Sequence, residues 1–167
     1  MWLTLAKKAV SAIATIATPW SRTKGSAPLQ ISTVVTRAAG GLVTRKSGTE
    51  ILIIHRISKN DWSLPKGKLK RNETSQQTAI REVREETGYH CKIADTEELN
   101  TYLYIDSSNR TKEIRYWLME IIDNRFNEKT FMPNDEVDVI KWVTKDVALS
   151  MLTHERDREL VGEHCYG

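Results

Sequence analysis

Residues 67–89 read Gly-Lys-Leu-Lys-Arg-Asn-Glu-Thr-Ser-Gln-Gln-Thr-Ala-Ile-Arg-Glu-Val-Arg-Glu-Glu-Thr-Gly-Tyr. The hydroxyl of Thr74 or Ser75 can cap a helix N-terminus, and Gln77 stands where it would complete a capping box with Thr74. Gly88 suits the left-handed position just past a helix C-terminus. The stretch therefore predicts a helix of about three turns near residues 75–87.

Three glutamates share one face of this predicted helix, because Glu82, Glu85 and Glu86 stand at positions i, i+3 and i+4. Like charges at this spacing weaken an isolated helix by roughly a few tenths of a kcal/mol per pair, so a positive charge is needed nearby. Hard divalent cations such as Mg²⁺ bind carboxylate oxygens and keep positions open for water and phosphates. The alternative is a solvated acidic face partnered by arginines, which gives no role to the glycines or to Glu73.

The stretch resembles the Nudix box, G-x5-E-x7-R-E-U-x-E-E-x-G-U with U apolar, and every fixed position matches. By this resemblance the chain is identified as a MutT-like member of the Nudix hydrolase family. That family cleaves a nucleoside diphosphate linked to another group and uses a divalent metal. The resemblance implies an α/β fold, a Nudix α/β/α sandwich with a mixed β-sheet, in which the box loop and helix carry the metal site.

The resemblance also implies a role for each matching residue. Glu73 and Arg81 belong to the catalytic set as the pair that holds the box loop against the helix. The expected ion is Mg²⁺, with Mn²⁺ as an alternative. Its ligands would be Glu82, Glu85, Glu86 and the backbone carbonyl of Lys66 or Gly67.

A further acid precedes the predicted strand Val137–Val143. In the Nudix family a glutamate six residues before a tryptophan often serves as an extra metal ligand or as the base that activates water. Glu136 stands six residues before Trp142. The resemblance therefore implies that Glu136 or Glu85 takes the proton of the water, and the alternative for Glu136 is an ordinary loop acid.

Three cations are candidates for binding the substrate phosphates. Arg56 ends an apolar run that predicts a buried central strand, and it resembles a phosphate-contacting arginine of the MutT branch; the alternative is a surface arginine. Lys66 and Lys68 place positive charge beside the expected phosphates. Pro65 and Gly67 predict a rigid turn at the same place.

Two further segments resemble the dinucleoside tetraphosphate hydrolases: the run Trp62 to Gly67, with its Pro-Lys-Gly, and the strand Ile114 to Glu120. A tyrosine that marks that group is absent at the corresponding spacing. Base stacking is assigned to Tyr116 and is also open to Tyr102 and Tyr104, with packing in the core or on the sheet as the alternative.

The resemblance implies a Mg²⁺-dependent hydrolase of a pyrophosphate bond, acting on a nucleoside polyphosphate such as diadenosine tetraphosphate. The alternatives are a sanitising hydrolase of oxidised guanine nucleoside triphosphates, an inositol pyrophosphate phosphatase, and a nucleotide-binding regulator that does not catalyse. The partner is a small nucleotide, and no stable nucleic-acid partner is expected. The run Leu152–Leu160 resembles the end of some MutT-like proteins, but its chemistry assigns it no role.

Composition and periodicity predict the remaining elements. The 40% hydrophobic content of the 167 residues can build a core for one domain with a tail. Besides the box helix, the predicted strands are 31–44, interrupted at 38–41, then 51–56, 100–105, 113–122 and 137–143, and the predicted helices are 144–152 and 155–163.

The front of the chain differs in charge from the rest. Residues 1–49 carry seven basic residues and no acid, although the whole chain has a net charge of only +3. Residues 1–29 are predicted to be a basic amphipathic N-terminal arm and linker, and residues 30–167 the Nudix hydrolase domain. Several roles are open for this arm. It packs on the domain or on a partner, or it is a segment that binds a membrane surface or targets an organelle, or it is a weak signal peptide.

Two cysteines, Cys91 and Cys165, stand at no metal-binding or redox spacing. Reduced thiols and a cytoplasmic location are expected, with organelle targeting by residues 1–20 as the alternative. No run of about 18 or more apolar residues is present, so no membrane span is expected.

Overall fold

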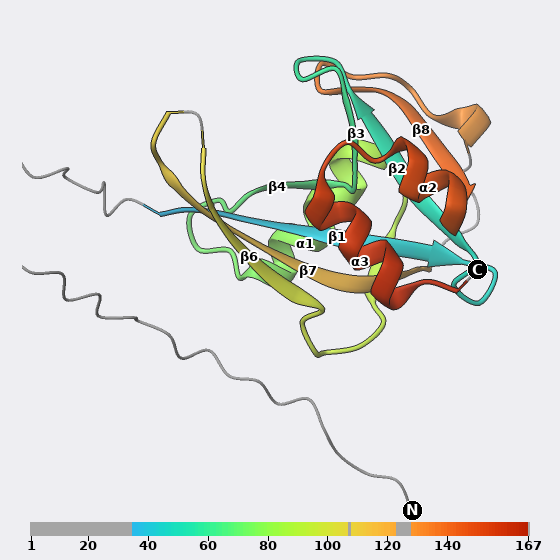
Figure 1. The fold of residues 1–167 in the computed structure, drawn as a ribbon, viewed down its shortest axis with the longest axis horizontal. Coiled ribbons are helices and arrows are strands. Elements are labelled where there is room, and N and C mark those ends of the chain that lie inside the picture. Colours follow the sequence, from blue (N-terminus) through green and yellow to red (C-terminus); the bar gives the residue numbers. More distant parts are fainter. Residues whose placement is uncertain (1–34, 107, 123–127, 167) are drawn as a thin grey trace, which may run out of the picture. The chain divides into compact units, whose positions relative to one another are not determined.

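Strand β1 (Thr36–Arg45) runs through the middle of a mixed sheet in the computed structural model, which describes residues 35–106, 108–122 and 128–166 (Figure 1). Along one edge β1 pairs in parallel with β7 (Thr111–Ile121). Antiparallel partners of β1 are β2 (Glu50–Arg56) and β4 (Lys66–Lys68). The sheet order is β3-β2-β1-β7-β5, with β8 paired to β2 and β6 paired to β7.

The other elements follow the chain between and after these strands. They are β3 (Asp61–Ser63), α1 (Ser75–Thr87), β5 (Cys91–Ile93), β6 (Asn100–Ile105), a 3-10 turn (Glu128–Thr130), β8 (Val137–Thr144), α2 (Lys145–Met151) and α3 (Glu155–His164).

Helices cover both faces of the sheet. Figure 1 shows α2 and α3 in front of the sheet, with α1 behind it. On the α1 side Ala79 and Val83 pack against buried residues of β1 and β2 in one core cluster. On the other side Leu160 and Val161 of α3 pack in a second cluster. The predicted α/β/α sandwich with a mixed sheet is therefore confirmed.

The box helix forms as predicted. The Thr74 side chain accepts a hydrogen bond from the Gln77 backbone, and the Gln77 side chain accepts one from the Thr74 backbone. Gly88 closes the helix with a φ of 78°. The predicted strands from residues 51, 100, 113 and 137 and the helices from residues 144 and 155 are also confirmed, within two residues at their ends.

One predicted interruption is wrong, because β1 continues through Gly40 and Gly41 as a regular strand. The glycines are there because other parts of the chain approach closely. A Cβ on Gly41 would lie 2.6 Å from the sulfur of Met119 and 2.9 Å from Val83, and a Cβ on Gly40 would overlap the carbonyl of Pro65. The pair marks tight internal packing within a continuous strand.

Three short strands were not predicted. Where a rigid turn at Pro65 and Gly67 was expected, the chain forms β4 from Lys66, which pairs with Gly40 of β1. Strands β3 and β5 were also missed. Each of the three has three residues, which is too short for the alternation of apolar and polar residues to show.

Several predictions concern residues outside the described ranges or are only partly addressed. The N-terminal arm of residues 1–29, the domain boundary at residue 30 and the first residues of the predicted strand 31–44 lie outside the described residues. Cys91 and Cys165 are both buried free thiols, and burial raises the pKa of Cys91 to about 12 and that of Cys165 to about 11. Among the helices within the described ranges, none has the length and apolar content needed to cross a membrane.

Candidate active site

The loop after β4 is tied to α1 through Glu73 and Arg81. Arg81 donates to both carboxylate oxygens of Glu73, at 2.6 and 2.8 Å, and to the carbonyl of Lys68 at 3.0 Å. Glu73 also accepts hydrogen bonds from the Lys70 amide and the Thr78 hydroxyl. The Arg81 hydrogen bonds are the largest cause that lowers the pKa of Glu73 to about 2. The two residues lie together as the sequence predicted.

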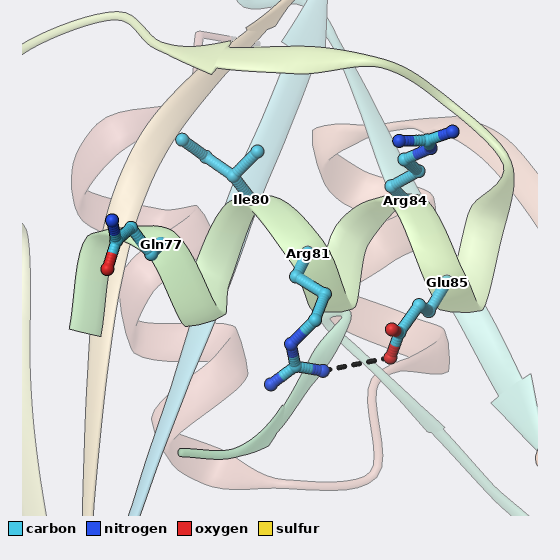
Figure 2. A pocket seen from close by; sticks show the side chains of 5 residues that line it. All are labelled: Gln77, Ile80, Arg81, Arg84 and Glu85. Carbon is cyan, nitrogen blue, oxygen red and sulfur yellow. Dashed lines mark hydrogen bonds and ion pairs between the residues drawn. The ribbon is translucent and has the colours of Figure 1, made fainter. Parts of the chain in front are cut away.

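Arg81 also holds two glutamates of its own helix. One of its terminal nitrogens donates to Glu82 at 2.5 Å and to Glu85 at 2.8 Å. Figure 2 shows the side chains of Arg81 and Glu85 pointing toward each other along α1. The contact to Glu73, ahead of those to Glu82 and Glu85, raises the pKa of Arg81 above its usual range. A single guanidinium group thus gathers three of the four box carboxylates.

Glu82 and Glu86 turn inward, toward the backbone of β4. A Cβ on Gly67 would overlap the Glu82 carboxylate, so only glycine lets this carboxylate lie against the backbone. Glu86 is 4% exposed and accepts a 2.7 Å hydrogen bond from the Lys66 amide. Burial raises the pKa of both carboxyl groups, although Arg81 opposes this at Glu82 and Lys66 opposes it at Glu86. The site therefore holds two poorly solvated acids.

The donor chemistry fits a divalent cation, although the side chains are not arranged around one. Within residues 35–106, 108–122 and 128–166, no group of three or more His, Cys, Asp or Glu side chains is placed to hold a metal. In this arrangement Arg81 contacts the carboxylates of Glu82 and Glu85. The Glu85 side chain is 51% exposed and forms ion pairs with Arg81 and Lys70, and such exposed pairs cost little to break. The buried carboxylates beside Gly67 are the hard oxygen donors that Mg²⁺ prefers.

Glu136 lies on the same side of the molecule as the box acids. Its negative charge contributes to raising the pKa of Glu82. Its carbonyl accepts a hydrogen bond from the Ile57 amide, and its amide donates to the Asn134 side chain. The carboxylate itself is in an exposed loop just before β8.

Asn134 is a site residue that the sequence analysis missed. Its side-chain oxygen accepts from the amides of Glu136 and Val137, and its side-chain nitrogen donates to the carbonyl of Glu85 at 3.4 Å. It therefore ties the Glu136 loop to the end of α1. An asparagine two residues before a loop acid is a typical turn signal, which would have indicated the first of these contacts.

The three candidate phosphate cations have different environments. Arg56 already forms a two-point ion pair with Asp61, at 2.7 and 2.5 Å, so it is not an unpartnered surface arginine. The Lys66 ammonium turns inward and donates to the Ser63 hydroxyl and the Leu64 carbonyl, so the prediction that it faces the phosphates is wrong. Lys68 is exposed beside the box loop, where its carbonyl contacts Arg81.

Tyr116 does not face a substrate, and its predicted stacking role is wrong. The side chain is fully buried, and its hydroxyl donates to Asp157 at 3.1 Å. Its strand lies at the centre of the sheet, and Leu160 of α3 belongs to the same core cluster on this face. Tyr102 packs edge-on against Tyr116, and Tyr104 is half-buried in the same cluster.

Comparisons with known proteins agree with this architecture. The chain is 35% identical over 122 residues to the 8-oxo-(d)GTP phosphatase of Mycolicibacterium smegmatis, an alignment that covers 73% of this chain and 35% of that protein. It is 29% identical over 149 residues to the putative mutator protein MutT4 of Mycobacterium tuberculosis, covering 84% of this chain and 58% of the relative. The chain thus spans a third to little more than half of the length of these two relatives.

Solved structures show the same fold. A C. elegans Ap4A hydrolase in a binary complex superimposes with a TM-score of 0.65 and 25% identity, over 77% of this chain and 93% of that one. Nudix hydrolases generally use a divalent metal ion, in keeping with the carboxylates gathered on α1. The family model described as the NUDIX domain matches residues 34–163, which confirms the resemblance of the box. The chain belongs to the NUDIX domain family.

Proposed function

We propose that this chain is a Mg²⁺-dependent hydrolase that cleaves a pyrophosphate bond in a nucleoside diphosphate linked to another group. The observation that carries the proposal is the placement of Glu82 and Glu86 against the backbone of β4. The two buried charges repel each other, and Arg81 compensates Glu82 from one side, so a further cation between the acids would be favourable. A divalent ion is such a cation and is also what phosphoric anhydride cleavage requires.

The carboxylates of the site would have two roles, metal binding and proton acceptance. Glu82, Glu85, Glu86 and the carbonyl of Lys66 or Gly67 would hold the ion, with Glu136 as a candidate extra ligand and Mn²⁺ as the alternative to Mg²⁺. When bound, the cation supplies Lewis-acid stabilisation of the charge that builds on the phosphate oxygens. A carboxylate oxygen of Glu136 or Glu85 accepts the proton of the attacking water.

Three cations act around these acids. Arg81 keeps the box acids oriented through its contacts to Glu73, Glu82 and Glu85. Lys68, exposed beside the loop, adds positive field for the substrate phosphates. Arg56 contributes to the same field from its pair with Asp61.

The substrate class favoured is a dinucleoside polyphosphate such as diadenosine tetraphosphate. The Pro-Lys-Gly phrase before the box supports this, and so does the Ap4A hydrolase among the similar structures. A second candidate is an oxidised guanine nucleoside triphosphate, which the 35% identity to the 8-oxo-(d)GTP phosphatase supports. The partner is then a small nucleotide, and a cytoplasmic location is proposed for the chain.

A substrate panel tests the proposal. Purified protein is incubated with diadenosine tetraphosphate, 8-oxo-GTP and an inositol pyrophosphate, each with and without Mg²⁺, and the products are separated by anion-exchange chromatography. We expect Mg²⁺-dependent release of mononucleotides from diadenosine tetraphosphate at the highest kcat/KM. Nucleotide binding without any turnover would instead indicate a regulator.

Replacing Glu85 with Gln tests the site itself. The change keeps the size of the side chain but removes a metal ligand and a candidate base, so kcat is expected to fall about 100-fold or more. Glu97→Gln is the matched control, because Glu97 is an exposed acid outside the box. Steady-state kinetics and circular dichroism of both variants separate lost chemistry from lost folding. Full activity in folded Glu85→Gln would rule out this assignment.

A further inference from the structure

The start of α3 is docked on the strand that leads into the box. The Thr153 amide donates to the Trp62 carbonyl at 3.0 Å, and the Trp62 amide donates to the Thr153 hydroxyl at 3.1 Å. The next residue after Thr153 meets the residue before Trp62, since the His154 Nε2 lies 2.9 Å from a carboxylate oxygen of Asp61. These contacts give a role to the run Leu152–Leu160, which the sequence analysis left unassigned.

Asp157 is the most deeply placed member of this contact. Its side chain is 0% exposed, and its two carboxylate oxygens accept from different parts of the fold. One accepts from the Leu64 amide at 3.3 Å, and the other accepts from the Tyr116 hydroxyl at 3.1 Å. The Arg156 side chain lies 3.5 Å away, and the buried Lys66 ammonium is among the groups that interact with it electrostatically. A buried carboxylate with this many partners fixes its neighbours in one arrangement.

Hydrogen bonds through Leu64 and Lys66 connect Asp157 to Glu86 of the box. Its carbonyl accepts from the Lys66 ammonium at 3.3 Å, while its amide is held by Asp157. The Lys66 amide in turn donates to Glu86 at 2.7 Å. The next residue is Gly67, whose backbone lies against the Glu82 carboxylate.

We propose that Asp157 is a positioning residue, which holds Leu64 from the opposite face of the sheet so that the Lys66 amide and the Gly67 backbone meet Glu86 and Glu82 correctly. Asp157 touches neither ion nor substrate in this role. The proposal rests on the proposed function in treating Glu86 as a metal ligand. The C-terminal helix is then part of the active-site architecture, although it contributes no ligand.

Asp157→Asn tests this, because the amide keeps the shape but loses the charge and one acceptor. Two measurements without substrate are informative: hydrogen–deuterium exchange of the Lys66 amide in metal-free protein, and Mn²⁺ affinity by calorimetric titration. Loss of a residue that orients a ligand weakens metal binding by about 10- to 100-fold. We expect the Mn²⁺ Kd to rise about 10-fold or more, and the Lys66 amide to exchange faster.

Val161→Ala is the control, because Val161 is buried on the same helix as Asp157, and its apolar side chain can form no hydrogen bond to the Leu64 amide. Val161→Ala should lower the melting temperature yet leave the Mn²⁺ Kd and the exchange rate of the Lys66 amide unchanged. Tyr116→Phe removes one donor to Asp157 and should shift both measurements in the same direction as Asp157→Asn, by less. It remains informative if Asp157→Asn does not fold.

The possible outcomes separate the two proposals. The positioning role would be overturned if Val161→Ala and Asp157→Asn changed the Mn²⁺ Kd and the exchange rate of the Lys66 amide equally. An unchanged exchange rate of the Lys66 amide in Asp157→Asn would also overturn it. If the unsubstituted protein binds no Mn²⁺, the proposed function fails, while the exchange of the Lys66 amide still decides whether Asp157 positions the loop.

Discussion

Arg81 shows how a single side chain can organise a site without being its chemical centre. Its guanidinium reaches Glu73, Glu82 and Glu85 together, which a lysine could not do, because an ammonium has no planar fork of donors. The sequence predicted the pairing of Glu73 with Arg81, since their spacing belongs to the box.

Sequence could not predict the direction of side chains that depend on distant packing. Lys66 and Tyr116 both belong to segments that resemble functional ones, yet one side chain turns inward and the other is fully buried. For Tyr116 the polar partner that makes burial possible is the distant Asp157 on α3, and for Lys66 it is Ser63, which lies on β3 three residues earlier in the chain. Such partners become visible only once the fold brings the elements together.

The lowered pKa of Glu73 predicts how its contribution to stability depends on pH. Its folded pKa of about 2 is below its ordinary value of 4.5, so the contribution is present above about pH 4.5 and is lost as the pH falls toward 2. We expect the melting-temperature gap between the unsubstituted protein and Glu73→Gln to be constant from pH 7 to 5 and to narrow below pH 4.5. Circular dichroism melts measure it, with Glu97→Gln as the control. A gap that stays constant down to pH 3 would contradict the charged role of Glu73.

At the scale of elements, β4 and α1 act as one unit. Strand β4 is held by β1, and this pairing sets the Gly67 backbone under the inward face of α1. The long elements were predictable, because α1 has caps and a regular apolar spacing over 13 residues. Strand β4 was not predictable, since three residues are too few to show an alternation of apolar and polar side chains and its partner β1 is distant in sequence.

Glycine substitutions test this unit. Gly67→Ala would place a methyl group on the Glu82 carboxylate and displace it, so Mn²⁺ binding and kcat should both be largely lost. Gly162→Ala is the matched control, because a Cβ there meets nothing within 4 Å and the residue lies inside α3. It should raise the unfolding free energy by about 1 kcal/mol, the helix preference of Ala over Gly. Denaturant titrations and kinetics check both, and an active Gly67→Ala would show that Glu82 tolerates displacement.

At the scale of the whole molecule, every described site side chain comes from residues 56–157. Deleting residues 1–28 should therefore leave kcat and the cooperative melting of the remaining chain unchanged, since the predicted domain begins near Gln30 and the family model matches from residue 34. Kinetics and melting of the full and shortened chains, together with their binding to anionic vesicles, show whether the arm acts only to place the protein at a membrane. A shortened chain that folds but loses turnover would make the arm part of the enzyme.

Among the described strands, β1 and β7 form the one parallel pairing, and this pairing affects how fast the protein folds. The two strands come from distant parts of the chain, and the whole segment from β2 to β6 lies in the loop that their pairing closes. Closing so large a loop costs chain entropy before its contacts are gained, which slows folding. During synthesis the chain must therefore extend past residue 121 before β7 is available to complete the core cluster against which α1 packs.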